Sequence, residues 1–196
     1  MKHFIDIREI DLDQLRMILK DSARLKKSRI GSHMGGIDSN PVLSDRVVAL
    51  LFKKPSTRTR FSFDVGVTQM GGKSITVSSD DMQLSNAEKM SDTAQVLSKY
   101  VDMIVLRTDD HHDFLELIEN SIVPVINGLS NSSHPCQVLA DIFTYEELMA
   151  PIKGKKVVWL GDGNNVCNSY IHSAEKFDFE FVYSGPEILR PCKLLG

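Results

Sequence analysis

The segment "RVVALLFKKPSTRTRFSF", residues 46–63, is the clearest indication of the fold of this chain. It begins with an apolar run typical of a buried strand, continues through a polar segment, and enters a predicted helix over residues 59–70. In open α/β sheets, ligands bind beyond the carboxyl ends of the strands, beside the N-termini of the helices that follow. The polar segment therefore predicts a ligand site, and its hydroxyls and arginines predict that the ligand is an anion.

The rest of the chain repeats this alternation of short apolar runs and helical segments. Strands are predicted over 46–52, 73–77, 102–106, 123–126, 155–160 and 179–183. Helices are predicted over 59–70, 88–100, 112–118, 135–149 and 165–176, after an opening helix that begins near Asp11. This order is typical of an α/β protein with a parallel sheet flanked by helices.

The segment "PIKG" at residues 151–154 separates two such alternations and predicts a domain boundary. The first domain, 1–150, has enough strands for a complete sheet. Residues 151–196 provide only a strand, a helix and a strand, and a parallel sheet needs more strands to bury both faces. We expect these residues to be the start of a second α/β domain, so that the sequence is C-terminally incomplete.

Composition excludes several classes of protein. The 196 residues carry a net charge of −3, which argues against a general nucleic-acid binder. The three cysteines, Cys136, Cys167 and Cys192, have no metal-ligand spacing and are typical of a reducing compartment. Residues 1–15 lack an apolar signal core, and no apolar run approaches the roughly 18 residues that span a bilayer. We expect a cytoplasmic protein with no membrane partner, no metal and no cofactor.

Two further predicted strands end in polar residues that would lie at the same edge of the sheet. Arg107 follows "DMIVL", and His134 and Gln137 belong to "HPCQ", after the strand at 123–126. An isolated arginine or histidine is usually a solvated or structural residue. Together with residues 56–60, however, they provide a phosphate cradle, a second cation, an imidazole and an amide. That set suits the binding of an acyl phosphate and the polarisation of its carbonyl group.

Six motifs then indicate a family: "KPSTRTRFSF", "MQLSNAE", "DTAQVLS", "VLRT", "HPCQVLAD" and "WLGDGNNV". Together they resemble the aspartate/ornithine carbamoyltransferase family, whose members transfer the carbamoyl group of carbamoyl phosphate to an amine. The resemblance implies that residues 1–150 form the carbamoyl-phosphate-binding domain. Residues 151–196 would be part of the amino-acid-binding domain.

The resemblance also implies roles for individual residues. The implied phosphate ligands are Ser56, Thr57, Arg58 and Thr59. The carbonyl oxygen would be contacted by Thr59, Arg107 and His134, and the carbamoyl amide by Gln137. The implied catalytic residues are Arg58, Arg107 and His134. Gln83 would reach the carbamoyl phosphate of a neighbouring subunit, which implies a homotrimer or a multiple of trimers.

The acceptor amine is implied by motifs of the ornithine branch. "HPCQ" and "GDGNN" resemble that branch, and the loop around Gln83 lacks the lysine-bearing pattern usual in aspartate enzymes. Asn165 is implied to contact the amino-acid end of L-ornithine. The expected reaction transfers the carbamoyl group to the δ-amine of L-ornithine and yields L-citrulline and phosphate.

Several alternatives stay open from the sequence. The chain could be a truncated, inactive domain that binds carbamoyl phosphate or a bare anion, since the Ser-Met-Gly and His-Cys-Leu-Pro segments of the ornithine branch do not occur in it. The acceptor could instead be aspartate or putrescine. Cys136 could be a small buried apolar residue, and Asn164 and Asn165 could cap a helix. A dinucleotide site at "GDGNN" is disfavoured because the glycine spacing differs from the fingerprint.

Overall fold

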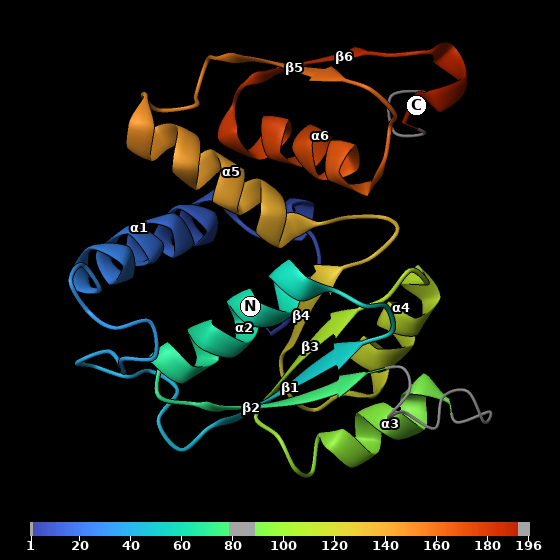
Figure 1. Ribbon diagram of the computed structural model, residues 1–196. Coiled ribbons are helices and arrows are strands. Elements are labelled where there is room, and N and C mark those ends of the chain that lie inside the picture. The colour runs from blue at the N-terminus through green and yellow to red at the C-terminus, as the bar shows by residue number, and fades with distance from the viewer. Residues whose placement is uncertain (1, 79–88, 192–196) are drawn as a thin grey trace.

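The computed structural model describes residues 2–78 and 89–191, which form two parallel sheets and their helices (Figure 1). The first sheet has the strand order β2-β1-β3-β4, and the second pairs β5 with β6. The strands are β1 (Val47–Phe52), β2 (Lys73–Ser78), β3 (Met103–Arg107), β4 (Val125–Leu129), β5 (Lys156–Leu160) and β6 (Glu180–Ser184). All of these pairings are parallel, so the predicted α/β fold class is confirmed.

The helices follow the predicted order. They are α1 (Leu12–Ser28), α2 (Thr57–Gln69), α3 (Met90–Leu97), α4 (His111–Asn120), α5 (Pro135–Leu148) and α6 (Asn165–Phe177), with short 3-10 turns η1 (Ile7–Glu9) and η3 (Glu187–Leu189). The predicted boundaries are wrong by a few residues. Helix α2 begins at Thr57, because Ser56 takes the N-cap position. Strand β4 begins at Val125, after Pro124, which has no N–H for the ladder. Within the described ranges, every helix is too short or too polar to cross a bilayer.

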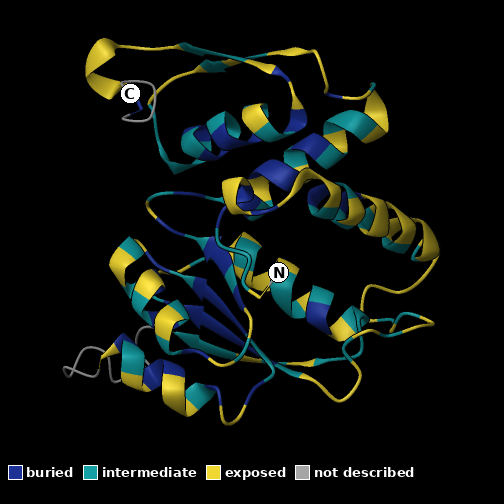
Figure 2. Ribbon diagram, turned by 180° about the vertical axis from the view of Figure 1, so that it is seen from behind, coloured by how far each residue is buried: buried dark blue, intermediate teal, exposed yellow. Residues whose placement is uncertain are grey.

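Strand β1 lies at the centre of the first sheet and is buried on both faces (Figure 2). Ala49 and Leu51 belong to one apolar cluster, whereas Val48, Leu50 and Phe52 belong to another, because successive side chains point to opposite faces. Helices α3 and α4 cover the first face with Met90, Ala94, Phe114 and Leu117. Helix α2 covers the second face with Phe63 and Val67.

A third apolar cluster lies among helices α1, α5 and α6 and joins the two sheets. It contains Leu15 of α1, Val138 and Ile142 of α5, and Phe177 of α6. Figure 1 shows α5 and α6 side by side above the four-stranded sheet, with α1 next to α5. Helix α5 therefore contacts elements on both sides of residue 150.

The N-terminal segment connects β4 to α6. The Phe4 N–H donates to Val125 O at 2.8 Å, which adds Phe4 to the edge of the sheet. Two residues later, Asp6 is buried and lies 2.7 Å from Nδ1 of His172, and its carboxylate also accepts a hydrogen bond from the Arg8 N–H at 3.1 Å. Burial raises the pKa of Asp6, but the hydrogen bond and charge of His172 and the Arg8 N–H outweigh it. The net pKa is therefore below the usual range.

We predict that Asp6→Asn lowers the free energy of unfolding by about 1–3 kcal/mol near neutral pH, because it removes a buried charge-assisted hydrogen bond. A carboxylate with a depressed pKa stabilises the fold above its unfolded pKa of about 3.9 and loses this effect as the pH falls through the lower folded value. Urea unfolding across that range should therefore show a difference that shrinks in acid. Asp13→Asn, at an exposed site in the first turn of α1, is the control. Equal losses from both variants would contradict the role of Asp6.

Candidate active site

A cavity of about 810 Å³ lies at the carboxyl ends of β1, β3 and β4. The predicted site residues that line it are Ser56, Thr57, Arg58, Thr59, Arg107, His134 and Gln137. They come from three separate segments of the chain, which the fold brings to one place as the sequence predicted. Two predicted residues are not among those lining the cavity. Gln83 lies outside the described residues. Asn165 does not line the cavity, although the next residue, Val166, does.

Parallel strand register explains why these segments meet. Phe52 of β1 is paired with Arg107 of β3, and Arg107 is paired with Leu129 of β4. The Lys53 N–H donates to Arg107 O at 2.9 Å, so the pairing continues into the polar segment after β1. The chain therefore leaves all three strands at the same edge of the sheet, where polar side chains can face a shared ligand.

The N-terminus of α2 opens on this cavity, and no side-chain cap for it is present among the described residues. Ser56 occupies the N-cap position, but its hydroxyl makes no capping hydrogen bond, and the first turn contains no acidic residue. The first N–H groups of a helix have no partner within the helix and carry partial positive charge. Thr57, Arg58 and Thr59 lie in this turn, so their N–H groups are available to an anion.

The two lysines of the polar segment are neutralised by nearby carboxylates. Lys53 Nζ lies 2.5 Å from Asp113 Oδ2, and Lys54 forms an ion pair with Asp109. Asp113 also accepts a hydrogen bond from Thr108 Oγ1 at 2.9 Å. These contacts tie the segment after β1 to the segment after β3. Neither lysine lines the 810 Å³ cavity.

Arg58 and Arg107, the two arginines that line the cavity, differ from these lysines. Neither arginine forms an ion pair with a carboxylate within residues 2–78 and 89–191. Arg107 Nη1 donates to Thr59 Oγ1 at 3.1 Å, while its buried Nε has no hydrogen-bond partner among the described residues. Burial lowers the pKa of Arg107, Asp109 partly offsets this, and the positive charge of Arg58 lowers it further. The cavity therefore holds positive charge that nearby carboxylates offset only in part and that an anion would neutralise.

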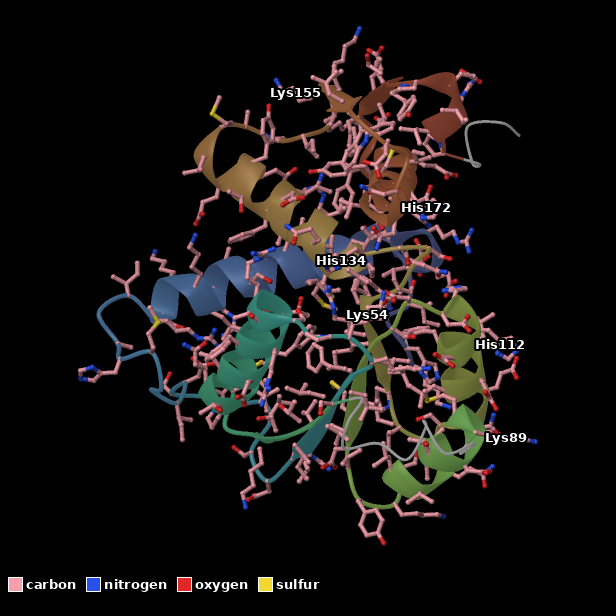
Figure 3. All side chains as sticks on the ribbon, turned by 45° about the vertical axis from the view of Figure 1, so that its right-hand side comes forward. Lys54, Lys89, His112, His134, Lys155 and His172 are labelled. Atoms are coloured by element: carbon pink, nitrogen blue, oxygen red, sulfur yellow. The ribbon has the colours of Figure 1, made fainter. Side chains whose placement is uncertain are left out.

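His134 enters the cavity as a neutral imidazole. It is the N-cap residue of α5 and lies between the four-stranded sheet and α6 (Figure 3). Burial and, secondarily, the charge of Arg107 lower its pKa to about 4, against a smaller opposing effect of Asp141. Its Nδ1 is buried and has no partner among the described residues. We therefore assign the tautomer with the proton on Nε2, because a proton on Nδ1 would be a buried donor without an acceptor. In this tautomer the neutral ring can donate a hydrogen bond from Nε2 to a ligand.

The orientation of Gln137 is fixed by a carboxylate one helical turn away. Gln137 Nε2 donates to Asp141 Oδ1 at 2.9 Å, and Asp141 Oδ2 accepts a hydrogen bond from Tyr170 OH at 3.0 Å. Because the amide nitrogen is directed at Asp141, the oxygen Oε1 is left as an acceptor. Gln137 can therefore accept a hydrogen bond from an N–H group of a ligand.

The asparagines at the start of α6 have separate roles. Asn164 caps the helix, since its side chain accepts hydrogen bonds from the N–H groups of Val166 and Cys167. Asn165 Nδ2 donates to Ser130 O at 2.6 Å and holds the loop after β4. One amide hydrogen of Asn165 remains for another acceptor.

Cys136 lines the cavity but is unsuited to nucleophilic chemistry. Its thiol contacts Asn127 O at 3.4 Å, and burial raises its pKa to about 12, so it stays protonated. Burial likewise raises the pKa of Cys167 to about 11. In the part of the chain that the structure describes, no three His, Cys, Asp or Glu side chains gather where a metal ion could bind.

Sequence reasoning missed residues that line or support the cavity. The additional lining residues include Ser62, Phe63, Leu129 and Ala140. Asp141 follows Gln137 by four residues, and this helical spacing could have identified it as a neighbour. Ser169 contacts the His134 N–H across 35 residues of sequence, and no local pattern points to that contact.

Comparison with known proteins now gives the family. A statistical model of the family described as "Aspartate/ornithine carbamoyltransferase, carbamoyl-P binding domain" matches residues 2–147. The chain belongs to the aspartate/ornithine carbamoyltransferase family. The resemblance seen in the six sequence motifs is thus confirmed.

Individual carbamoyltransferases are similar along nearly the whole chain. The ornithine carbamoyltransferases of Cereibacter sphaeroides and Ruegeria pomeroyi are 51% and 52% identical over 191 residues, which is 97% of this chain and 62% of each relative. The crystal structure of ornithine carbamoyltransferase from Burkholderia thailandensis matches with a TM-score of 0.90 at 40% identity, covering 100% of this chain and 66% of that one. The chain therefore spans 62% of the length of these two curated relatives.

We predict that Arg58→Ala weakens the binding of inorganic phosphate about tenfold or more. Hydrogen bonds to a charged group contribute about 1.5–3 kcal/mol, and about 1.4 kcal/mol is a factor of ten. Arg60→Ala is the matched control, because Arg60 follows two residues later and lines a neighbouring cavity of about 280 Å³ instead. Titration calorimetry should show the Arg60 variant within about twofold of the unmodified protein. Equal weakening by both variants would mean that general positive charge binds the anion.

We also predict that the His134 ring titrates near pH 4 in the free protein. Inorganic phosphate should raise this pKa, because its negative charge offsets the effect of Arg107. Arg107→Ala should raise it too, but not to about 6.5, since burial is the larger cause. Nuclear magnetic resonance of the imidazole resonances measures all three values. A midpoint near 6.5 in the free protein would refute the buried, neutral ring.

Proposed function

We propose that this chain provides the carbamoyl-phosphate site of an ornithine carbamoyltransferase. The reaction transfers the carbamoyl group from carbamoyl phosphate to the δ-amine of L-ornithine and releases L-citrulline and phosphate. The observation that carries the proposal is the cavity itself, in which two arginines without carboxylate partners face a neutral imidazole and an oriented amide. Ornithine as the acceptor is supported by the two relatives that are 51% and 52% identical, both of which are ornithine carbamoyltransferases.

In this proposal the phosphate group lies at the N-terminus of α2. The N–H groups and hydroxyls of Ser56, Thr57 and Thr59 donate to its oxygens, and Arg58 supplies a forked, charged donor. Arg107 adds a second positive charge from β3. A dianionic leaving group would be stabilised both before and after the carbon–oxygen bond breaks.

The carbonyl group then lies toward Thr59, Arg107 and His134. Attack of the neutral δ-amine on the carbonyl carbon places negative charge on the carbonyl oxygen, and these donors stabilise that charge. The contact between Arg107 Nη1 and Thr59 Oγ1 at 3.1 Å places two of the donors together before any ligand binds. Gln137 Oε1 accepts from the carbamoyl NH₂ group, which fixes the orientation of the carbonyl.

Proton transfer does not require a protein base in this scheme. His134, with a pKa of about 4, is neutral and acts as a donor through Nε2. The departing phosphate can take the proton that the amine loses on attack. Asn165 would contact the amino-acid end of ornithine with its second amide hydrogen, next to the wall residue Val166.

The same proposal covers the wider organisation of the protein. Residues 1–150 would bind carbamoyl phosphate, and residues 151–196 would belong to the ornithine-binding domain; the family match to residues 2–147 supports the first assignment. The assembly would be a homotrimer or a multiple of trimers in the cytoplasm, with Gln83 reaching a neighbouring subunit. Its product, citrulline, would serve arginine biosynthesis.

A product assay on the purified protein tests the function. Carbamoyl phosphate is supplied with ornithine, aspartate or putrescine in parallel reactions. We expect citrulline from ornithine and no carbamoylated product from the other two amines. Product from aspartate or putrescine would contradict the assigned acceptor. Phosphate binding without any product would favour a domain that binds the anion alone.

His134→Ala should lower kcat by roughly 100- to 1000-fold, the loss typical of removing one oxyanion donor. The dissociation constant of inorganic phosphate should change little, because the proposed phosphate contacts come from α2 and Arg107. Steady-state kinetics and calorimetry on the same preparation separate the two effects. An unchanged kcat would exclude a carbonyl role for His134.

A further inference from the structure

The loop that carries His134 is held by α6, which follows it in the sequence after α5 and β5. We propose that Ser169 and Asn168 of α6 are positioning residues that set the place of the His134 imidazole in the cavity. This inference rests on the proposed function, in which that imidazole donates to the carbonyl oxygen. Neither residue lines the cavity, so each would act on the chemistry indirectly, through the loop that carries His134.

The contact that carries the inference is a backbone hydrogen bond across two elements. The His134 N–H donates to Ser169 Oγ at 2.8 Å, and Ser169 is 1% exposed. Two residues earlier in the loop, Ser132 O accepts a hydrogen bond from Asn168 Nδ2 at 3.1 Å. Adjacent residues of α6 therefore hold the two ends of the segment 132–134.

The opposite side of this loop is held by the sheet. Ser133 is fully buried, and its hydroxyl accepts a hydrogen bond from Asn127 Nδ2 at 3.0 Å. The Ser130 N–H donates to Ser133 O at 3.0 Å. The loop is thus held by β4 on one side and by α6 on the other. Ser169 contacts His134, the residue of this loop that takes part in the proposed chemistry.

The orientation of the His134 imidazole depends on the backbone that carries it. In many sites a partner at Nδ1 fixes the ring. Here Nδ1 of His134 is buried without a hydrogen-bond partner among the described residues. The direction of the ring is therefore set by the backbone at His134 and by packing, and the hydrogen bond to Ser169 fixes that backbone.

The central test compares Ser169→Ala with Ser173→Ala. Ser173 is the matched control, because it is also buried on α6 and its hydroxyl donates to Ser169 O at 2.7 Å, within the helix. We expect Ser169→Ala to lower kcat about tenfold with the KM for carbamoyl phosphate within about twofold, since small displacements of a catalytic group cost up to about 100-fold. Ser173→Ala should change neither constant by more than about twofold. Equal losses in the two variants would overturn the proposal.

A double-mutant cycle separates positioning from general loosening of the fold. If Ser169 acts through His134, Ser169→Ala should cost less than about twofold in a His134→Ala background. The same tenfold loss in both backgrounds would contradict the inference. Asn168→Ala is a second variant for the case in which Ser169→Ala does not fold. Its Oδ1 has no partner among the described residues, so its removal leaves few other groups unpaired.

Amide hydrogen exchange keeps this test independent of the proposed activity. In Ser169→Ala, or in Asn168→Ala if that is the variant that folds, the His134 N–H should exchange at least about tenfold faster than in Ser173→Ala. If the unmodified protein makes no citrulline, the proposed function fails, and the exchange rates still decide whether α6 holds the loop. Unchanged protection of the His134 N–H would overturn the positioning role whatever the activity.

Discussion

The site depends on the parallel pairing of β1, β3 and β4. Their register brings the end of β1 beside Arg107 and the end of β4, so three segments that are far apart in sequence leave the sheet at one edge. Burial on both faces of β1 fixes this register, because a shift of one residue would exchange the side chains that face α2 with those that face α3 and α4. The burial of β1 therefore determines both the packing of the apolar core and the position of the ligand site.

The preference of this edge of the sheet for an anion depends on which cationic side chains have carboxylate partners and which do not. Lys53 and Lys54 have carboxylate partners, whereas Arg58 and Arg107 have none among the described residues. Partly burying the Arg107 guanidinium without an ion-pair partner, and leaving the His134 Nδ1 without a hydrogen-bond partner among the described residues, costs stability in the free protein. Binding an anion would recover part of this cost. The arrangement is thus suited to a phosphorylated substrate. Burial is the main cause that lowers the pKa of Arg107 and of His134, and the charge of a neighbouring arginine lowers each of them further.

Much of the fold and the first half of the site could be predicted from sequence. Strand and helix periods are local, and the hydroxyl and arginine pattern of residues 56–60 lies in one stretch. The sequence could not show that the two lysines are neutralised and the arginines of the cavity are not. Asp109 and Asp113 lie beside the lysines only in the folded chain. Nor could it reveal the Ser169 contact, which depends on how α6 packs against the loop after β4. The domain boundary and the roles of all the site residues, including Gln83 and Asn165, stay predictions.

The decisive measurement is a crystal structure of the protein with phosphonoacetamide, a stable analogue of carbamoyl phosphate. We expect the phosphonate oxygens to bind the N–H groups of Thr57–Thr59 and the Arg58 guanidinium. We also expect the amide oxygen to lie within hydrogen-bond distance of Thr59, Arg107 and His134. A phosphonate bound instead among Lys54 and Arg60 in the neighbouring cavity, or an amide oxygen that points away from His134, would refute the proposed site.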